Sequence, residues 1–121
     1  MKKFLIFLFA LVISGCSGDP KTPSDLIKKA YSEVCTKKDL VVLANYMLPG
    51  NAQAYRAGSQ LSKTMSNALG VNLSAQIVSM CKEPIKIISE QLNGDRALVL
   101  TSYKTRDVLI KVDNKWYITL Q

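Results

Sequence analysis

Histidine is absent from this chain of 121 residues. Without an imidazole, Ser-His-Asp and Cys-His catalytic arrangements are excluded, and a zinc site would need unusual ligands. Cysteine is scarce, with three residues, and no glycine-rich loop of the phosphate-binding type occurs. The sequence therefore predicts no catalytic residue, no metal site and no cofactor. We expect a protein that is not an enzyme, with an enzyme pocket as the least favoured alternative.

Acidic side chains are also few, with 9 Asp and Glu against 16 Lys and Arg, which gives a formal net charge of +7. The basic residues are scattered, form only two doublets after the first three residues, and do not alternate with aromatic residues. This distribution argues against nucleic acid as a partner. It is typical of a solvated surface, or of a weak attraction to anionic membrane headgroups.

Long hydrophobic runs are missing, and the longest one covers residues 4–13, directly after Lys2 and Lys3. Ten residues in a helix rise about 15 Å, half of a bilayer core of roughly 30 Å, so this run is too short for a permanent membrane span. A basic start, a short apolar stretch and then the small residues Ser14 and Gly15 are typical of a secretory signal peptide. We assign residues 1–15 to it.

The residues at the predicted cleavage site, Ile13-Ser14-Gly15-Cys16, resemble the lipobox of bacterial lipoproteins. The resemblance implies cleavage before Cys16, a diacylglycerol group on its sulfur and, as a rule, acylation of the new amino group. Two or three acyl chains, of the palmitate kind, anchor a protein firmly. By the same resemblance, Ser17 rather than Asp after the lipidated cysteine favours the outer membrane, facing the periplasm. The alternative is an ordinary secretory signal in which the cysteine is coincidental.

Residues 16–22 form a polar stretch rich in turn formers, which predicts a flexible tether. Its six residues after Cys16 reach about 20 Å when fully extended. The remaining residues, 23–121, are enough for one domain, which we expect to lie close to the membrane.

The first half of the domain has helical patterning. Thr22 as an N-cap, Pro23 at the first position and Asp25 at the third predict a helix start. Apolar residues then recur on one helical face: Leu26, Ile27, Ala30, Tyr31, Val34 and Cys35. Asp39 is predicted to cap a second short helix that ends at residues 49–50.

Residues 51–82 have a weaker pattern, which predicts one or two helices with a break near Gly70. Helical spacing holds for the apolar residues Leu61, Met65, Leu69, Leu73, Ile77 and Met80. The set from Met65 onward either packs in the core or lines a ligand pocket. Core packing is favoured, because methionine is a routine gap-filler.

The last third has the period of two that is typical of strands. Strands are predicted at 85–92, 96–105, 108–112 and 115–120, with an irregularity at Ile87-Ile88 and tight turns at 93–95 and 113–114. Trp116, Ile118 and Leu120 are expected on one face. Helices packed on a four-stranded antiparallel meander give an α+β domain.

Two stretches of the strand region have a further likeness. Asn-Gly-Asp-Arg-Ala-Leu-Val at 93–99 and Asp-Asn-Lys-Trp-Tyr-Ile at 113–118 resemble small envelope lipoproteins of the NTF2-like (cystatin-like) superfamily, including the group labelled DUF4878. The resemblance implies a helical layer and a curved sheet that form a cone, often with a pocket, and a tryptophan packed on the core.

We expect such a pocket, if present, to be lined by Tyr31, Met65, Ile77 and Trp116. Enzymatic members of the superfamily place Asp, His or Tyr in it. Here Asp95, Asp107 and Asp113 are expected at strand ends and turns, where aspartate is common for backbone reasons.

With Cys16 lipidated, Cys35 and Cys81 remain, and a secreted chain meets an oxidising compartment. We predict that they form a disulfide; in the chain-entropy model such a link stabilises the domain by roughly 4 kcal/mol. The alternative is two buried free thiols.

These observations predict a lipid-anchored envelope protein that binds a protein partner or a small apolar ligand. The second hypothesis is a structural or stress-related lipoprotein that acts at the anionic membrane or cell-wall surface.

Overall fold

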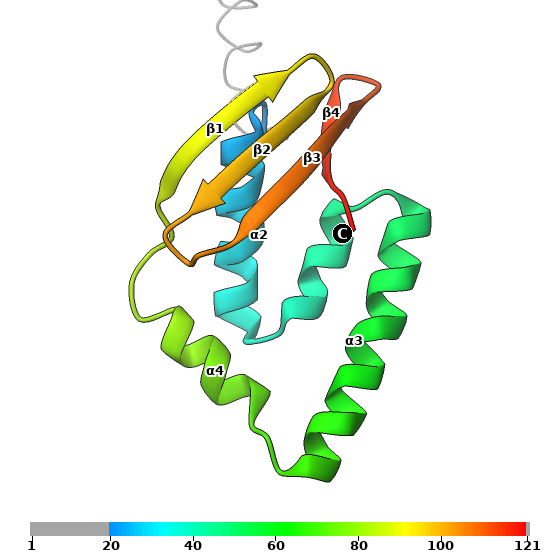
Figure 1. The fold of residues 1–121 in the computed structure, drawn as a ribbon, viewed down its shortest axis with the longest axis vertical. Helices are drawn as coiled ribbons and strands as arrows, with labels where there is room; N and C mark the ends of the chain where they lie inside the picture. The colour runs from blue at the N-terminus through cyan, green and yellow to red at the C-terminus, as the bar shows by residue number, and fades with distance from the viewer. Residues whose placement is uncertain (1–19, 121) are drawn as a thin grey trace, which may run out of the picture.

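The computed structural model describes residues 20–120 (Figure 1). Within this range the helical elements come first: α2 (Pro23–Lys37), the 3₁₀ helix η1 (Leu40–Tyr46), α3 (Pro49–Leu69) and α4 (Leu73–Met80). The strands follow: β1 (Ile87–Asn93), β2 (Arg96–Thr101), β3 (Arg106–Val112) and β4 (Lys115–Ile118). They form one antiparallel sheet in the order β1-β2-β3-β4. The predicted α+β class, with helices packed on a four-stranded meander, is confirmed.

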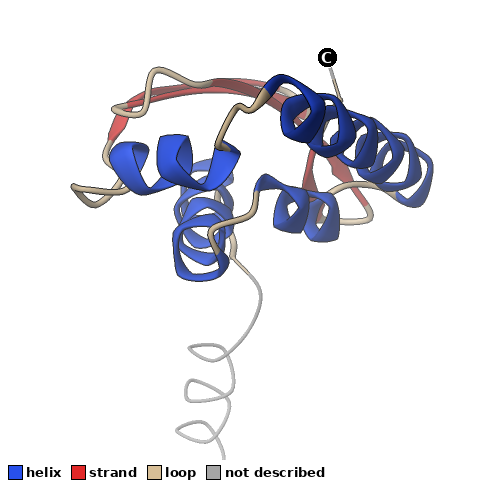
Figure 2. Ribbon diagram, turned by 90° about the horizontal axis from the view of Figure 1, so that it is seen from below, coloured by secondary structure: helices blue, strands red, loops and turns tan. Residues whose placement is uncertain are grey.

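The helix α2 packs against the sheet (Figure 2) and against η1. Its N-terminus is capped as predicted, since the hydroxyl of Thr22 accepts a hydrogen bond from the Asp25 amide at 3.1 Å. Its buried face is the predicted one: Leu26, Ile27, Ala30, Tyr31 and Val34. The helix ends at Lys37, and its C-cap residue Lys38 takes a left-handed conformation with φ of 55°.

The sheet supplies the other half of the core by alternation. Ala97, Val99 and Thr101 of β2 are buried, while the residues between them are only partly covered. Leu109 of β3 is fully buried, and Trp116 and Ile118 of β4 face the same layer. The turn residues Gly94, Asp113 and Asn114 all have positive φ, which is what tight hairpins require.

Of two predicted details of the sheet, one is confirmed and the other is wrong. The irregularity at Ile87-Ile88 is confirmed by a shift of register between Ile87 and Ser89. The strand predicted at 96–105 is too long, because the chain turns after Thr101. The Thr101 amide donates to the Thr105 carbonyl at 3.2 Å, and Lys104 has φ of 63°. The residues of this turn also alternate between more and less polar side chains, so a period of two in the sequence does not show where the strand ends.

The helical half and the C-terminus differ from expectation at three points. The second helix is a 3₁₀ helix, capped by Asp39 as predicted. The prediction that residues 49–50 end this helix is wrong, because η1 ends at Tyr46 with Met47 as its C-cap. Pro49 instead begins α3, at a position where proline is favoured. Leu120 is 42% exposed and does not join Trp116 and Ile118 in the core. The predicted break near Gly70 is confirmed, since Gly70 caps α3 with φ of 75°.

Candidate functional site

An open groove lies between η1, α3 and α4, with a volume of about 1110 Å³. We call it the α3–α4 groove. Its apolar and aromatic lining residues come from all three elements, the loop between α3 and α4 and the C-terminal segment: Leu40, Val41, Ala54, Tyr55, Val71, Leu73, Ile77, Met80 and Leu120. Small polar side chains of α3 and α4 complete its walls, among them Ser59, Ser62 and Ser74.

One wall of the groove is a helix that the core barely supports. Of the 21 residues of α3, only Ala52 is buried. Leu61, Met65 and Leu69 follow at intervals of four, so they share one face, and they are 62%, 56% and 76% exposed. Helices in proteins owe most of their stability to packing of an apolar face. The outer part of α3 therefore presents a face that nothing among the described residues covers.

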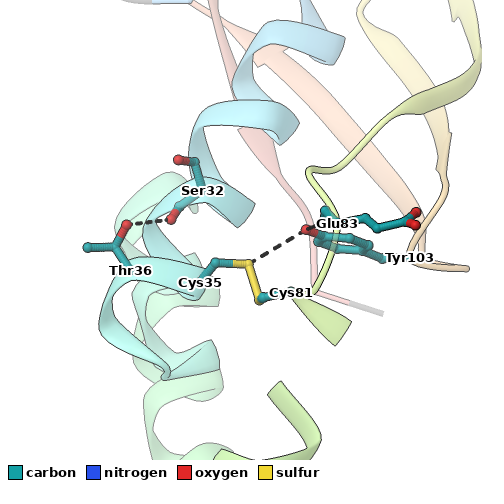
Figure 3. The surroundings of a disulfide bond; sticks show 6 residues. All are labelled: Ser32, Cys35, Thr36, Cys81, Glu83 and Tyr103. Atoms are coloured by element: carbon teal, nitrogen blue, oxygen red, sulfur yellow. Dashed lines mark hydrogen bonds between the residues drawn. A yellow bond between two sulfur atoms is a disulfide. The ribbon is translucent and has the colours of Figure 1, made fainter. Parts of the chain in front are cut away.

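The other wall, α4, is held at few points. Asn72 caps its start by accepting from the Ala75 amide at 3.1 Å, and Ile77 is its only buried residue. Cys81, directly after the helix, forms the predicted disulfide with Cys35 of α2. Figure 3 shows Tyr103 beside this bond: its hydroxyl lies 3.7 Å from the Cys35 sulfur and donates to the Glu83 carbonyl at 2.6 Å.

The charged residues that line the groove are two lysines and one aspartate, Lys38, Lys63 and Asp39. Lys63 of α3 donates to the Asp39 carboxylate at 2.7 Å. Burial works to raise the pKa of Asp39, but the hydrogen bonds from Lys63 and the Val41 amide hold it below its ordinary value. Lys38 also lines the groove, is exposed, and makes no ion pair with any residue of the described range. From residue 49 to residue 82 the sequence has no acidic side chain.

A polar cluster lies under the sheet, outside the groove. The Tyr31 hydroxyl donates to the Asp107 carboxylate, at 3.2 Å to Oδ1 and 3.4 Å to Oδ2. Burial raises the pKa of Asp107, opposed by hydrogen bonds from Thr105 and Tyr31. Burial and then the charge of Asp107 raise the pKa of Tyr31. Asp107 therefore lies in β3, is partly buried and has hydrogen-bond partners for its carboxylate. From the sequence it was expected at a strand end, where aspartate is common because of its backbone preferences.

The four residues predicted to share a pocket do not come together. Ile77 lines the α3–α4 groove. Tyr31 is buried in the core against Tyr103, with ring centroids 6.1 Å apart, and Met65 is exposed on α3. Trp116 borders a separate hollow of about 130 Å³ near Pro20. Helical spacing alone could not separate these places, because it says which residues share a face and not what that face meets.

The sequence does contain a signal for the groove, but it lies in composition and not in helical spacing. Residues 49–69 contain many small and polar residues and few large apolar ones, and the adjoining stretch to residue 82 lacks carboxylates. A helix of this composition has too little apolar surface to be enclosed by a core.

Comparison with known proteins found no match to any family model, any curated protein or any solved structure. The resemblance to NTF2-like lipoproteins therefore stays a prediction. Cys16, the leader and residues 16–19 of the tether lie outside the described residues. Within residues 20–120, no helix is long and apolar enough to cross a membrane, and no three metal-ligating side chains gather.

Proposed function

We propose that this chain is a lipid-anchored protein of the bacterial cell envelope, not an enzyme, whose domain binds a protein partner at the α3–α4 groove. One observation carries the proposal: an exposed apolar face, formed by Leu61, Met65 and Leu69, lies on α3, the helix that also forms one wall of the open groove. Exposed apolar patches of this kind mark interaction sites in soluble domains.

The shape of the groove favours a protein over a small apolar ligand. Small-molecule sites are typically concave cavities of about 300–1,000 Å³ that enclose most of the ligand and hold a few precisely placed polar groups. The α3–α4 groove, of about 1110 Å³, is open to solvent and therefore does not enclose a small ligand. Every buried side-chain nitrogen and oxygen of the described residues already has a hydrogen-bond partner, so no buried polar group needs a ligand to complete its hydrogen bonds.

The position of the groove favours a partner over the membrane surface. The domain starts at Pro23, and the connection between α3 and α4 lies at the opposite end of the molecule (Figure 1). A tether of about 20 Å would keep the start of α2 near the bilayer, whereas the connection between α3 and α4 is at the far end of the domain (Figure 1). The disulfide gives weak additional support for a location outside the cytoplasm.

The test is photocrosslinking in intact envelopes, with the photoreactive residue at Ser62 in the groove and, as control, at Gly50. Both positions are exposed on α3, but Gly50 does not line the groove, and no atom lies within 4 Å of a side chain started there. We expect a protein adduct from Ser62 and none from Gly50. Equal adducts from both positions, or none from Ser62, would contradict the proposal.

A further inference from the structure

A second, smaller hollow of about 130 Å³ lies where the described part of the chain begins, since Pro20 is one of its lining residues. We call it the Pro20 hollow. Two lysines, one amide and three aromatic residues from α2, η1 and β4 also line it: Lys29, Asn45, Tyr46, Lys115, Trp116 and Tyr117. No carboxylate of the described residues is among its lining residues.

Positive charge gathers around this hollow. Lys29 is exposed on α2 and makes no ion pair with any other residue of the described range. Asn45 accepts a hydrogen bond from Nη2 of Arg56 at 3.2 Å, which brings a guanidinium group of α3 to the rim. The carboxylate of Glu33 is also close, since it accepts a hydrogen bond from the Tyr46 hydroxyl. The two lining lysines and the arginine outnumber this carboxylate, so the hollow favours an anionic occupant.

The distance from the predicted anchor indicates which anion reaches the hollow. Pro20 is four residues after Cys16, and four fully extended residues span at most about 14 Å. The headgroup layer on each side of a bilayer is about 5–8 Å thick. A lipidated Cys16 would therefore keep the hollow within reach of headgroup phosphates, whichever direction the tether takes. A tethered group meets such a surface at a high effective concentration.

The aromatic residues of the hollow suit a membrane interface. Tyr46 and Tyr117 are half-buried, and Trp116 is buried beneath them with 9% of its surface exposed. The Lys111 ammonium group lies 5.7 Å from the centre of the Trp116 ring and adds a further positive charge. Tyrosine and tryptophan are enriched at the level of lipid headgroups, because they combine an apolar ring with a polar tip.

We infer that the Pro20 hollow binds the phosphate of an anionic lipid headgroup in the membrane that carries the anchor. This inference rests on the lipid anchor proposed above and adds a membrane-facing surface to it. The bound headgroup holds the start of α2 against the bilayer and leaves the connection between α3 and α4 at the far end of the domain (Figure 1).

The experiment uses the full lipidated chain in phospholipid vesicles and follows the fluorescence of Trp116, which is the one tryptophan of the chain. A nitroxide group on a minor fraction of the headgroups quenches this fluorescence at short range. We expect quenching to be about twofold stronger in vesicles that contain phosphatidylglycerol than in phosphatidylcholine vesicles, and about 1 M salt to remove the difference. Equal quenching in both kinds of vesicle would overturn the inference.

Lys29→Gln tests the hollow itself. The control, Lys37→Gln, makes the same change of charge at an exposed position about 12 Å further along α2 that does not line the hollow. We expect Lys29→Gln to lower the ratio of docked to undocked domains about fivefold, the effect of removing one basic side chain from a membrane surface. Lys37→Gln should leave this ratio unchanged. Equal losses in both variants would show a general attraction to the membrane and refute a site at the hollow.

The outcomes keep the inference and the lipid anchor apart. If the chain washes off the vesicles in high salt, the anchor and the headgroup site both fail. If the chain stays on the vesicles but quenching does not depend on lipid charge, the anchor stands and only the headgroup site is refuted. This second result is the one expected if Asp19, the acidic residue directly before Pro20, occupied the hollow in place of a lipid.

Discussion

Cys81, the residue directly after α4, is bonded to Cys35 on α2, with 5.7 Å between their α-carbons and a separation of 46 residues along the chain. Because Ile77 is the only buried residue of α4, this bond is the main restraint on the helix that forms one wall of the groove. The disulfide therefore stabilises the domain and also fixes the shape of the candidate site.

Replacing both cysteines, Cys35→Ala with Cys81→Ala, is expected to lower the free energy of unfolding by about 4 kcal/mol, since the link no longer restricts the unfolded chain. Urea denaturation followed by circular dichroism measures the loss. Wild-type protein treated with dithiothreitol is the control and should match the double variant. Hydrogen exchange should quicken first in α4. A variant as stable as the oxidised wild type would show that the bond contributes nothing.

The Asp107 carboxylate should make stability depend on pH. Because burial raises its pKa above the ordinary value of 3.8, the folded state holds a proton that the unfolded state releases. Its contribution to stability is complete below pH 3.8 and is lost as the pH rises through the folded pKa. Asp107→Asn has no carboxylate to ionise, so its stability should not fall as the pH rises through the folded pKa of Asp107. The variant should therefore gain stability relative to wild type across that window, as measured by urea denaturation at a series of pH values.

Tyr31→Phe provides the matched comparison for Asp107. It keeps the ring in the core but removes a hydrogen bond that lowers the pKa of Asp107. The loss of stability with rising pH should then extend to higher pH than in wild type. Profiles of wild type, Asp107→Asn and Tyr31→Phe that run parallel would contradict the role given to this carboxylate.

Filling the groove should abolish partner binding without unfolding the domain. Gly58 lines the groove within α3, and a side chain started there meets no atom within 4 Å. Gly58→Leu is expected to keep or slightly raise stability, by about 0.5–1 kcal/mol, because glycine is a poor helix former. It should eliminate the Ser62 crosslink. Gly50→Leu, on the same helix but outside the groove, should leave it intact, and loss in both variants would point to a general effect on α3.

Lipidation at Cys16 is tested by mass spectrometry of the mature N-terminus. We expect a chain that starts at Cys16 and carries acyl groups, and we expect Cys16→Ala to remain unprocessed by the lipoprotein pathway. A mature chain without acyl mass would assign residues 1–15 to an ordinary secretory signal.

Much of the domain was predictable because its local signals agree with the fold. Thr22 and Asp39 act as caps, Gly70 ends a helix, and the turns at 94–95 and 113–114 lie where the sequence has turn residues. The pairing of Cys35 with Cys81 followed from removing Cys16 from the cysteine count. These predictions depend on a few neighbouring residues or on simple counting, so they do not require knowledge of distant contacts.

The candidate site was less predictable, for the opposite reason. The helical spacing of Leu61, Met65 and Leu69 was visible, but it could not tell whether that face met the core or solvent. Tyr31 and Asp107 lie 76 residues apart, and only packing of α2 on the sheet brings them together. The four residues predicted to line one pocket therefore lie in several separate places in the fold: Tyr31, Met65, Ile77 and Trp116.

The sequence alone determined the order of helices and strands, some of their ends, the positive charge and the prediction of a lipidated Cys16, because each depends on local residue chemistry. The tertiary structure decided which apolar residues are enclosed. With α2 filling the sheet face, no room remains in the core for the outer part of α3. Its apolar face is consequently left beside an open groove, and the disulfide between Cys35 and Cys81 holds the opposite wall in place.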